Sequence, residues 1–186
     1  RQVRILRRDI DRLGFANSFT IYDTSDSQAV VKRILKEMNL DEKAFPYRAV
    51  LTEISRAKDS GITPEQYLAR AQATHNPRSI RIGEVYQTYW QRLFSAGAMD
   101  FDDLIYNTVR LLDEHEDVRE HWQRRFRYVL IDEYQDTNNL QYQLAALLAD
   151  GWGNICVVGD DDQSIYKFRG ADITNILNFE KEYKGC

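Results

Sequence analysis

The sequence predicts an α/β fold that is predominantly α-helical, and three observations carry this prediction. Apolar residues recur at helical spacing, with capping signals between the runs, over residues 25–126. Two continuous apolar runs that end in acids follow, RYVLID (127–132) and NICVVGD (154–160), and such runs are typical of parallel strands buried on both faces. A helical pattern separates them, and the order strand–helix–strand favours a parallel sheet with a right-handed crossover.

The first helical run is amphipathic, and Gly14 ends it. Its apolar face consists of Val3, Leu6, Ile10 and Leu13. The β-prone segment FTIYD (19–23) predicts a brief strand. Ser25 and Gln28 then have the spacing of a capping box, which predicts that the next helix starts there. The inward residues of that helix are Val30, Val31, Ile34, Leu35 and Met38.

Further start and stop signals define the helices that follow. Pro46 opens one helix, and Gly61 ends it. The segment Thr63-Pro64-Glu65-Gln66 combines an N-cap, a proline at the first helical position and a capping-box glutamine. The spacing then predicts a helix over about 78–94, with an apolar face of Ile82, Val85, Tyr86, Tyr89, Trp90, Leu93 and Phe94.

The helices around the two predicted strands have their own caps. Asp100 caps FDDLIYNTVRLL, and a helix with Val118, Trp122 and Phe126 leads into the first strand. Asn138 caps the helix between the strands, whose apolar residues are Leu140, Leu144, Leu147 and Leu148. Asp172 caps a last helix with Ile173, Ile176, Leu177 and Phe179. The residues at the carboxyl ends of the two strands are where such sheets carry function.

Length and composition restrict the class of protein. The chain has 186 residues, of which 43% are hydrophobic and 29% charged, so we expect one ordinary domain or two small ones with a sizeable core. No apolar run approaches the roughly 18–20 residues that cross a bilayer, and the first residues lack the apolar region of a signal peptide. We therefore expect a soluble, cytoplasmic protein that does not enter a membrane.

The positions of the cysteines and histidines exclude a disulfide-stabilised protein and a zinc-binding protein. The two cysteines form neither a disulfide framework nor a ligand cluster, and Cys156 lies in an apolar run, where a small buried side chain is expected. The three histidines do not have the spacing of zinc ligands. We therefore expect a reducing compartment and no zinc.

The net charge of −4 argues against nucleic-acid binding over the whole surface. The arginines are nevertheless concentrated in two segments: Arg1, Arg4, Arg7, Arg8 and Arg12 in the first, and Arg119, Arg124, Arg125 and Arg127 in the second. Each segment reads either as a solvated helix face or as a local contact for nucleic acid.

Two adjacent acids end the first strand. Asp132 and Glu133 read either as turn formers for the next helix or as a pair in which one acid binds a metal and the other orients a water. Gln163, after the second strand, has an amide that could reach a terminal phosphate. Tyr166, Phe168 and Arg169 follow, and such a cluster either packs inside the protein or stacks bases and contacts backbone phosphates.

These segments resemble the motifs of one family. LIDEYQDTN resembles motif II, the Walker B variant, of the superfamily 1A DNA helicases related to UvrD, PcrA and Rep. GDDDQSIYKFRGAD (159–172) resembles their motif III. MDFDDLI (99–105) resembles the segment that re-enters their first RecA-like domain after the helical insertion called 1B. FTIYD, the helical stretch to about 96 and ILRRDI at the start fit the same layout, so the resemblance spans essentially the whole chain.

The resemblance implies a role for each residue of the two motifs. Asp132 would hold Mg²⁺, Glu133 would be the catalytic base that activates water against the γ-phosphate of ATP, and Gln163 would sense that phosphate. Gln135 and Asp136 would help to couple the nucleotide site to motif III.

The DNA contacts are also implied by the resemblance. Tyr166, Phe168 and Arg169 would contact single-stranded DNA. Phe168 stands where many relatives carry tryptophan, and its smaller ring implies a slightly weaker stacking contact. The implied activity is ATP-driven 3′→5′ movement on single-stranded DNA and unwinding of duplex DNA in repair or replication.

The resemblance divides the chain into residues 1–24 and 99–186, two parts of RecA-like domain 1A, and 25–98, the 1B insertion. The family's phosphate-binding P-loop, G-x-x-x-x-G-K-[ST], is absent from the 186 residues, because none of the nine glycines precedes a lysine. We therefore expect a fragment that lacks ATPase activity on its own. Its two strands would keep uncovered edges and faces, which predicts rearrangement or self-association.

Two alternatives remain open at this point. The chain could be a binding module whose arginine-rich helices dock on duplex DNA or a repair partner. It could also be the helicase-like arm of a helicase–nuclease or of a restriction-associated protein.

Overall fold

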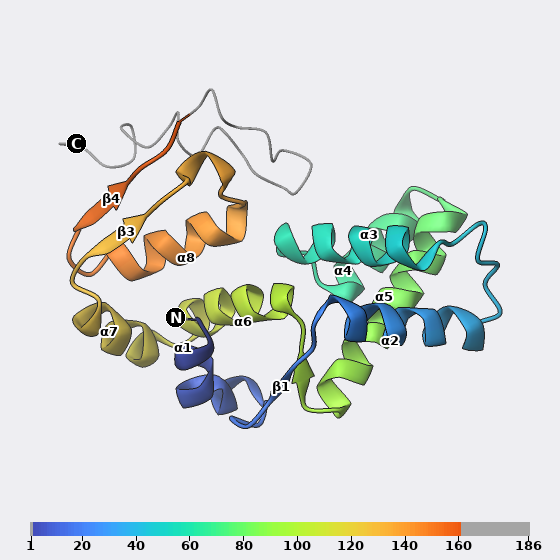
Figure 1. Cartoon of the computed structure of the whole chain (residues 1–186), viewed down its shortest axis with the longest axis horizontal. Helices are drawn as coiled ribbons and strands as arrows, with labels where there is room; N and C mark the ends of the chain where they lie inside the picture. Colours follow the sequence, from blue (N-terminus) through green and yellow to red (C-terminus); the bar gives the residue numbers. More distant parts are fainter. Residues whose placement is uncertain (1, 161–186) are drawn as a thin grey trace. The chain divides into compact units, whose positions relative to one another are not determined.

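A computed structural model describes residues 2–160 of the chain. The chain divides into two compact units, residues 1–106 and residues 107–186, and the boundary falls within helix α6. Figure 1 shows the helices and strands of both units, and each unit is described by itself below. No helix of the described part is long and apolar enough to cross a membrane.

The first unit consists of helices and one small parallel sheet. Strand β1 pairs in parallel with β2, with Thr20 opposite Ala98. The brief strand predicted within residues 19–23 is confirmed, whereas its partner β2 was not predicted. The elements are α1 (Gln2–Asp9), the 3₁₀ helix η1 (Ile10–Leu13), β1 (Thr20–Ile21), α2 (Thr24–Glu37), α3 (Tyr47–Asp59), α4 (Pro64–Ala73), α5 (Pro77–Ser95), β2 (Ala98–Met99) and α6 (Phe101–Glu114).

Helices α2, α3 and α5 supply most of the core of this unit. Their apolar positions recur at helical spacing and face one another, as the sequence pattern predicts. Fully buried members include Val31, Ile34, Val50, Ile54, Val85, Tyr86 and Tyr89. On the predicted face of α5, Trp90 is partly buried, and Phe94 is 47% exposed although its ring packs against that of Phe15, 4.9 Å between centroids.

The helix ends test the predicted caps. Thr63 accepts a hydrogen bond from the N–H of Gln66, and Gln66 accepts one from the N–H of Thr63, so the predicted capping box of α4 is confirmed. The capping box predicted at Ser25 is wrong: α2 starts two residues earlier, with Asp23 and Asp26 as the reciprocal pair. An aspartate in this extended conformation competes well for the cap because its carboxylate also favours the positive end of the helix dipole.

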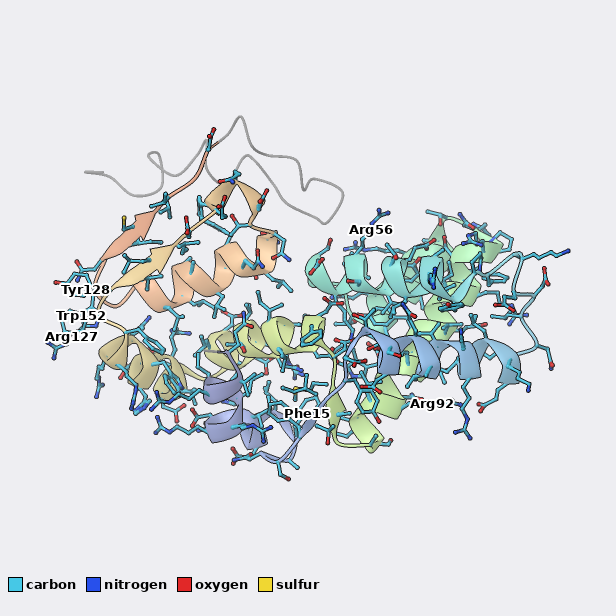
Figure 2. All side chains as sticks on the ribbon, viewed as in Figure 1. Phe15, Arg56, Arg92, Arg127, Tyr128 and Trp152 are labelled. Atoms are coloured by element: carbon cyan, nitrogen blue, oxygen red, sulfur yellow. The ribbon has the colours of Figure 1, made fainter. Side chains whose placement is uncertain are left out.

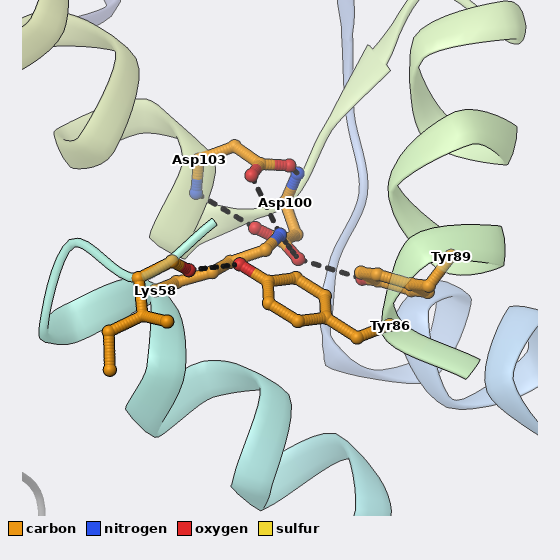
Figure 3. A network of polar contacts seen from close by, with 6 residues as sticks. Lys58, Tyr86, Tyr89, Asp100 and Asp103 are labelled. Carbon is orange, nitrogen blue, oxygen red and sulfur yellow. Dashed lines mark hydrogen bonds and ion pairs between the residues drawn. The ribbon is translucent and has the colours of Figure 1, made fainter. Parts of the chain in front are cut away.

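A buried ionic cluster joins α3 to the start of α6 (Figure 3). The Nζ of Lys58 lies 2.7 Å from a carboxylate oxygen of Asp100 and 2.7 Å from one of Asp103, and none of its side chain is exposed. Tyr89 of α5 donates to the same Asp100 at 2.7 Å, and Tyr86 donates to the carbonyl of Ile62. Asp100 also caps α6, as predicted, because it accepts from the N–H of Asp103 at 2.8 Å.

The second unit contains a two-stranded parallel sheet. Its elements after α6 are α7 (Glu116–Arg125), β3 (Val129–Ile131), the 3₁₀ helix η2 (Tyr134–Asp136), α8 (Asn139–Ala149) and β4 (Ile155–Val157). Strand β3 pairs in parallel with β4, with Leu130 opposite Cys156, and α8 connects them. The predicted strand–helix–strand order and the cap of α8 at Asn138 are confirmed.

The prediction that both strands are buried on both faces is wrong for the described residues. Leu130 is 72% exposed, and Cys156, expected to be buried, is exposed as well. The alternate residues Val129 and Ile131 are half-buried, and α8 packs against β3 (Figure 1). A continuous apolar run therefore forms a strand here, but a single described helix covers only one of its faces.

Candidate functional site

The candidate site is the turn that follows β3 at the carboxyl end of the sheet. The strand ends at Ile131, and Asp132 and Glu133 are the next two residues, both exposed. The sheet therefore delivers two adjacent carboxylates to solvent at the edge where parallel α/β sheets place their ligands.

The backbone of this turn has an uncommon conformation. Glu133 has a φ of 52°, in the left-handed region that residues other than glycine rarely adopt. Its N–H donates to Oδ1 of Asp132 at 3.0 Å, and its carbonyl accepts from the N–H of Asp136 at 2.9 Å. The two acids are thus fixed relative to each other by the turn, and such conformations concentrate at functional sites.

Gln135 joins the two strand ends. Its Nε2 donates to Oε2 of Glu133 at 2.7 Å, and its Oε1 accepts from the backbone N–H of Asp160 at 2.9 Å. The side chain is 1% exposed, so both ends of its amide are used inside the protein. Gln135 therefore positions the Glu133 carboxylate and ties it to the residue that follows β4.

Backbone hydrogen bonds hold the turn against β4. Tyr134 is fully buried, and its N–H donates to the carbonyl of Val158 at 2.9 Å. The N–H of Val158 donates in turn to the carbonyl of Ile131 at 2.8 Å. The hydroxyl of buried Thr137 donates to the carbonyl of Tyr134 and closes the 3₁₀ turn.

The oxygen donors of this turn suit a hard cation. Oδ1 of Asp136 is buried and has no hydrogen-bond partner among the described residues. No three His, Cys, Asp or Glu side chains of residues 2–160 gather into a metal-binding group. One or two carboxylates are nevertheless the usual protein share of a Mg²⁺ site whose other ligands are waters and phosphate oxygens. The exposed carboxylate of Asp132 fits that share.

Half of the predicted site lies beyond what the structure describes. The structure brings Asp132, Glu133, Gln135 and Asp136 together in one turn. Gln163, Tyr166, Phe168 and Arg169 lie outside the described residues, and so does the helix predicted after Asp172.

Two parts of the site were not predicted from the sequence. The link from Gln135 to Asp160 joins residues 25 positions apart, and only the parallel pairing of β3 and β4 brings them together. The other is the hydrogen bond from the Thr137 hydroxyl to the carbonyl of Tyr134, which is local in sequence. A threonine directly before the helix cap Asn138 is a signal that could have indicated it.

Comparison with known proteins defines the family. Residues 2–184 match the model of the UvrD/REP helicase N-terminal domain. The chain is 50% identical over 181 residues to a protein of Bacillus subtilis (strain 168) named ATP-dependent DNA helicase PcrA, an alignment that covers 97% of this chain. Proteins of the same name from Staphylococcus aureus (strain Mu50) and Staphylococcus epidermidis (strain ATCC 12228) are 48% and 47% identical over the same length.

The chain belongs to the UvrD/REP helicase family, in the region of its N-terminal domain. Within that family it is similar to the helicases named PcrA. It spans about a quarter of the length of these relatives, since the alignments cover 24% of each.

Proposed function

We propose that the chain is part of an ATP-dependent DNA helicase and carries its water-activating acids. The observation that carries this proposal is the side chain of Gln135, which links Glu133 to Asp160 across the carboxyl ends of β3 and β4. A carboxylate held in this way is positioned to act on a substrate and to respond to movement of the segment after β4. The family match and the names of the relatives support the same reading.

The proposed roles divide the chemistry between two acids. Asp132 would ligate Mg²⁺, which neutralises the phosphates of bound ATP and supplies electrophilic assistance. Glu133 would accept a proton from the water that attacks the γ-phosphate, and the Nε2 of Gln135 would keep its carboxylate oriented. The 1A and 1B division at residues 1–24, 25–98 and 99–186 belongs to the same proposal.

Residues after β4 complete the proposed reaction. Gln163 would contact the γ-phosphate, and Tyr166, Phe168 and Arg169 would contact single-stranded DNA. ATP hydrolysis would then drive 3′→5′ movement on the strand and unwinding of duplex DNA, in repair or replication. These assignments come from the resemblance of GDDDQSIYKFRGAD to motif III.

The decisive experiment compares two variants of the full-length protein. We expect Glu133→Gln to lower the DNA-stimulated ATPase rate by at least about 100-fold while ATP binding is retained, because the amide cannot accept the proton. Glu65→Gln, on the exposed start of α4, is the matched control and should leave the rate unchanged. A wild-type rate for Glu133→Gln would refute the proposed role.

A second experiment uses the 186-residue chain alone. It contains no G-x-x-x-x-G-K-[ST] loop to hold the phosphates, so we expect no ATPase activity above background. Turnover by this chain that Glu133→Gln abolishes would show that phosphate contacts within the 186 residues are sufficient, and the proposal of an inactive part would be wrong.

A binding module is the second candidate function, and one observation favours it. Arg4, Arg7 and Arg8 are all exposed on α1. Arg7 is engaged internally, because its guanidinium lies 4.9 Å from the ring centroid of Phe19 and donates to the carbonyl of Phe19. Arg8 pairs with Asp9 at 3.6 Å, so neutralising Arg4 is the cleaner test. Salt-dependent binding of duplex DNA by the chain alone that Arg4→Gln weakens would support a binding module.

A further inference from the structure

Helices α2 to α5 form a helical lobe, residues 24–95, that is attached to the rest of the first unit through a short pair of strands. The chain enters the lobe after β1 and leaves it before β2, and the two strands pair in parallel. The N–H of Thr20 donates to the carbonyl of Gly97 at 2.9 Å, and the N–H of Tyr22 donates to that of Met99 at 2.8 Å. We call β1 and β2 the neck of the lobe.

The lobe is held together by its own contacts. Its helices share one core, in which Val31 of α2, Ile54 of α3 and Val85 of α5 are buried. At the surface, Arg92 of α5 pairs with Glu37 of α2, and Figure 2 labels this arginine. A group of helices with its own core can turn as one body about a short attachment, which is the geometry of a hinge.

The buried ionic cluster ties the lobe to the residues directly after the neck. Lys58 and Tyr89 belong to the lobe helices α3 and α5, whereas Asp100 follows β2 and caps α6. Both lobe side chains reach Asp100 at 2.7 Å, and Lys58 also reaches Asp103 at 2.7 Å (Figure 3). These contacts join the lobe to α6 without passing through the neck. A rotation of the lobe about the neck therefore has to break them.

Burial makes the cluster the contact that resists such a rotation most strongly. None of the Lys58 side chain and only 6% of the Asp100 side chain is exposed. Separating a buried cation from its carboxylate leaves both charges without a partner in a medium of low dielectric constant. A second contact between the lobe and the chain before the neck, the ring of Phe94 against that of Phe15, lies at the surface and loses less on separation.

We propose that the neck is a hinge and that the contacts of Lys58 and Tyr89 with Asp100 are its lock. While the lock is closed, as in this structure, the lobe and the start of α6 move as one body. When it opens, the lobe turns about β1 and β2. Helix α6 continues into the second unit, so the lock fastens the lobe to a helix that both units share. None of these residues takes part in the proposed hydrolysis of ATP, so this conformational role is independent of it.

The test compares amide hydrogen exchange, measured by mass spectrometry, in two variants of the full-length protein that each lose one tyrosine hydroxyl. Tyr89→Phe removes a hydrogen bond that crosses from the lobe to Asp100. Tyr86→Phe, about one turn earlier on α5, is the matched control, because it removes a hydrogen bond to the carbonyl of Ile62 within the lobe. Both rings are fully buried and remain in place, so the packing of the core is retained in each variant.

The amides of Thr20 and Tyr22 report on the neck, because their hydrogen bonds close it. We expect Tyr89→Phe to raise the exchange rate of these amides by about tenfold or more, since the lock loses a hydrogen bond to a charged group. Tyr86→Phe should change it by less than about twofold, because its hydrogen bond stays intact when the lobe turns as one body.

A second variant acts on the other side of the lock. Asp100→Asn keeps a good helix cap but removes the charge that faces Lys58, so it should also raise the exchange of the neck amides. Two results would overturn the proposal. Equal rises in Tyr89→Phe and Tyr86→Phe would show that the neck amides exchange only when the whole lobe unfolds. Unchanged exchange in Tyr89→Phe would show that the neck opens independently of the cluster. Near-ultraviolet circular dichroism of each variant verifies that it is folded.

Discussion

At the scale of single residues, Gln135 makes the most specific contribution, because one buried amide contacts both sides of the proposed site. In Gln135→Glu the new carboxylate cannot donate to Glu133 and repels it. We expect the ATPase rate of the full-length protein to fall by about 10- to 100-fold, the usual effect of removing a positioning partner. Gln91→Glu, on the exposed face of α5, is the control. An unchanged rate would show that Glu133 does not depend on this contact.

Lys58 is the residue on which the ionic cluster of the first unit depends. Lys58→Met keeps the length of the side chain but leaves Asp100 and Asp103 buried without their cation. We expect a loss of about 3–5 kcal/mol in the free energy of unfolding, measured by chemical denaturation. Lys36→Met, at an exposed position of α2, should change it by less than about 0.5 kcal/mol. Similar losses in both variants would contradict the structural role.

The same cluster predicts a dependence of stability on pH. Burial raises the pKa of Asp103 to about 7, helped by the charge of Asp100 and opposed by Lys58. The pKa of Asp59 is also raised to about 7, by partial burial and by the charges of Asp102 and Asp100. The folded chain therefore binds more protons than the unfolded chain between pH 3.8, the ordinary value for aspartate, and about 7.

It follows that the free energy of unfolding should fall as the pH rises through this window. Asp100 does not reverse the trend, because its pKa is lowered and it titrates below the window despite its own burial. Denaturation midpoints measured at several pH values test this prediction. Burial and the charge of Asp100 raise the pKa of Asp102 too, which acts in the same direction. Asp103→Asn removes one of these titrating groups and should flatten the profile, and a wild-type slope in that variant would rule out Asp103 as a source.

At the scale of elements, the start of α2 allows the observed cap, Asp23, to be tested against the predicted cap, Ser25. Asp23 accepts from the N–H of Asp26 at 2.8 Å, whereas Ser25 is an exposed residue within the first turn. We expect Asp23→Ala to lower the free energy of unfolding by about 1 kcal/mol and Ser25→Ala to have little effect. Thermal or chemical denaturation of the two variants makes the comparison. A larger loss in Ser25→Ala would restore the boundary that the sequence pattern predicts.

The elements that could be predicted are those with strong local signals. Helical spacing and caps located α3, α4, α5 and α8, because those signals lie within a few residues of each helix end. Strand β2 was missed because its two residues, Ala98 and Met99, carry no pattern and are defined only by pairing with β1. The cluster around Lys58 was missed for the same reason, since it joins residues 42 positions apart.

The burial of the strands is a feature that the sequence could not predict. The apolar run through Leu130 correctly predicted a strand, but an apolar sequence does not say which chain segment covers it. Of the candidate site, the sequence placed the acids Asp132 and Glu133 at the end of the first strand, as observed. The coupling role that the family resemblance implies for Gln135 stays a prediction. The sequence could not predict the link to Asp160, which depends on the register of two strands.

At the scale of the whole molecule, the exposed face of the β3–β4 sheet predicts how the 186-residue chain behaves alone. Leu130 and Val158 are both largely exposed, so we expect binding of an apolar dye and self-association in light scattering. Leu130→Glu should reduce both signals, and Phe101→Glu, at another exposed apolar residue, should leave them largely unchanged. A strict monomer with little dye binding would count against this prediction.

The left-handed backbone at Glu133 has a consequence for protein engineering. At a φ of 52° glycine is the residue that the turn favours, and Glu133→Gly would relieve backbone strain. A redesign guided only by stability would select that glycine and would discard the carboxylate that we assign to catalysis. With the role proposed for Glu133, thermal tolerance and turnover make opposite demands at this position, and a thermostable version would have to gain its stability elsewhere.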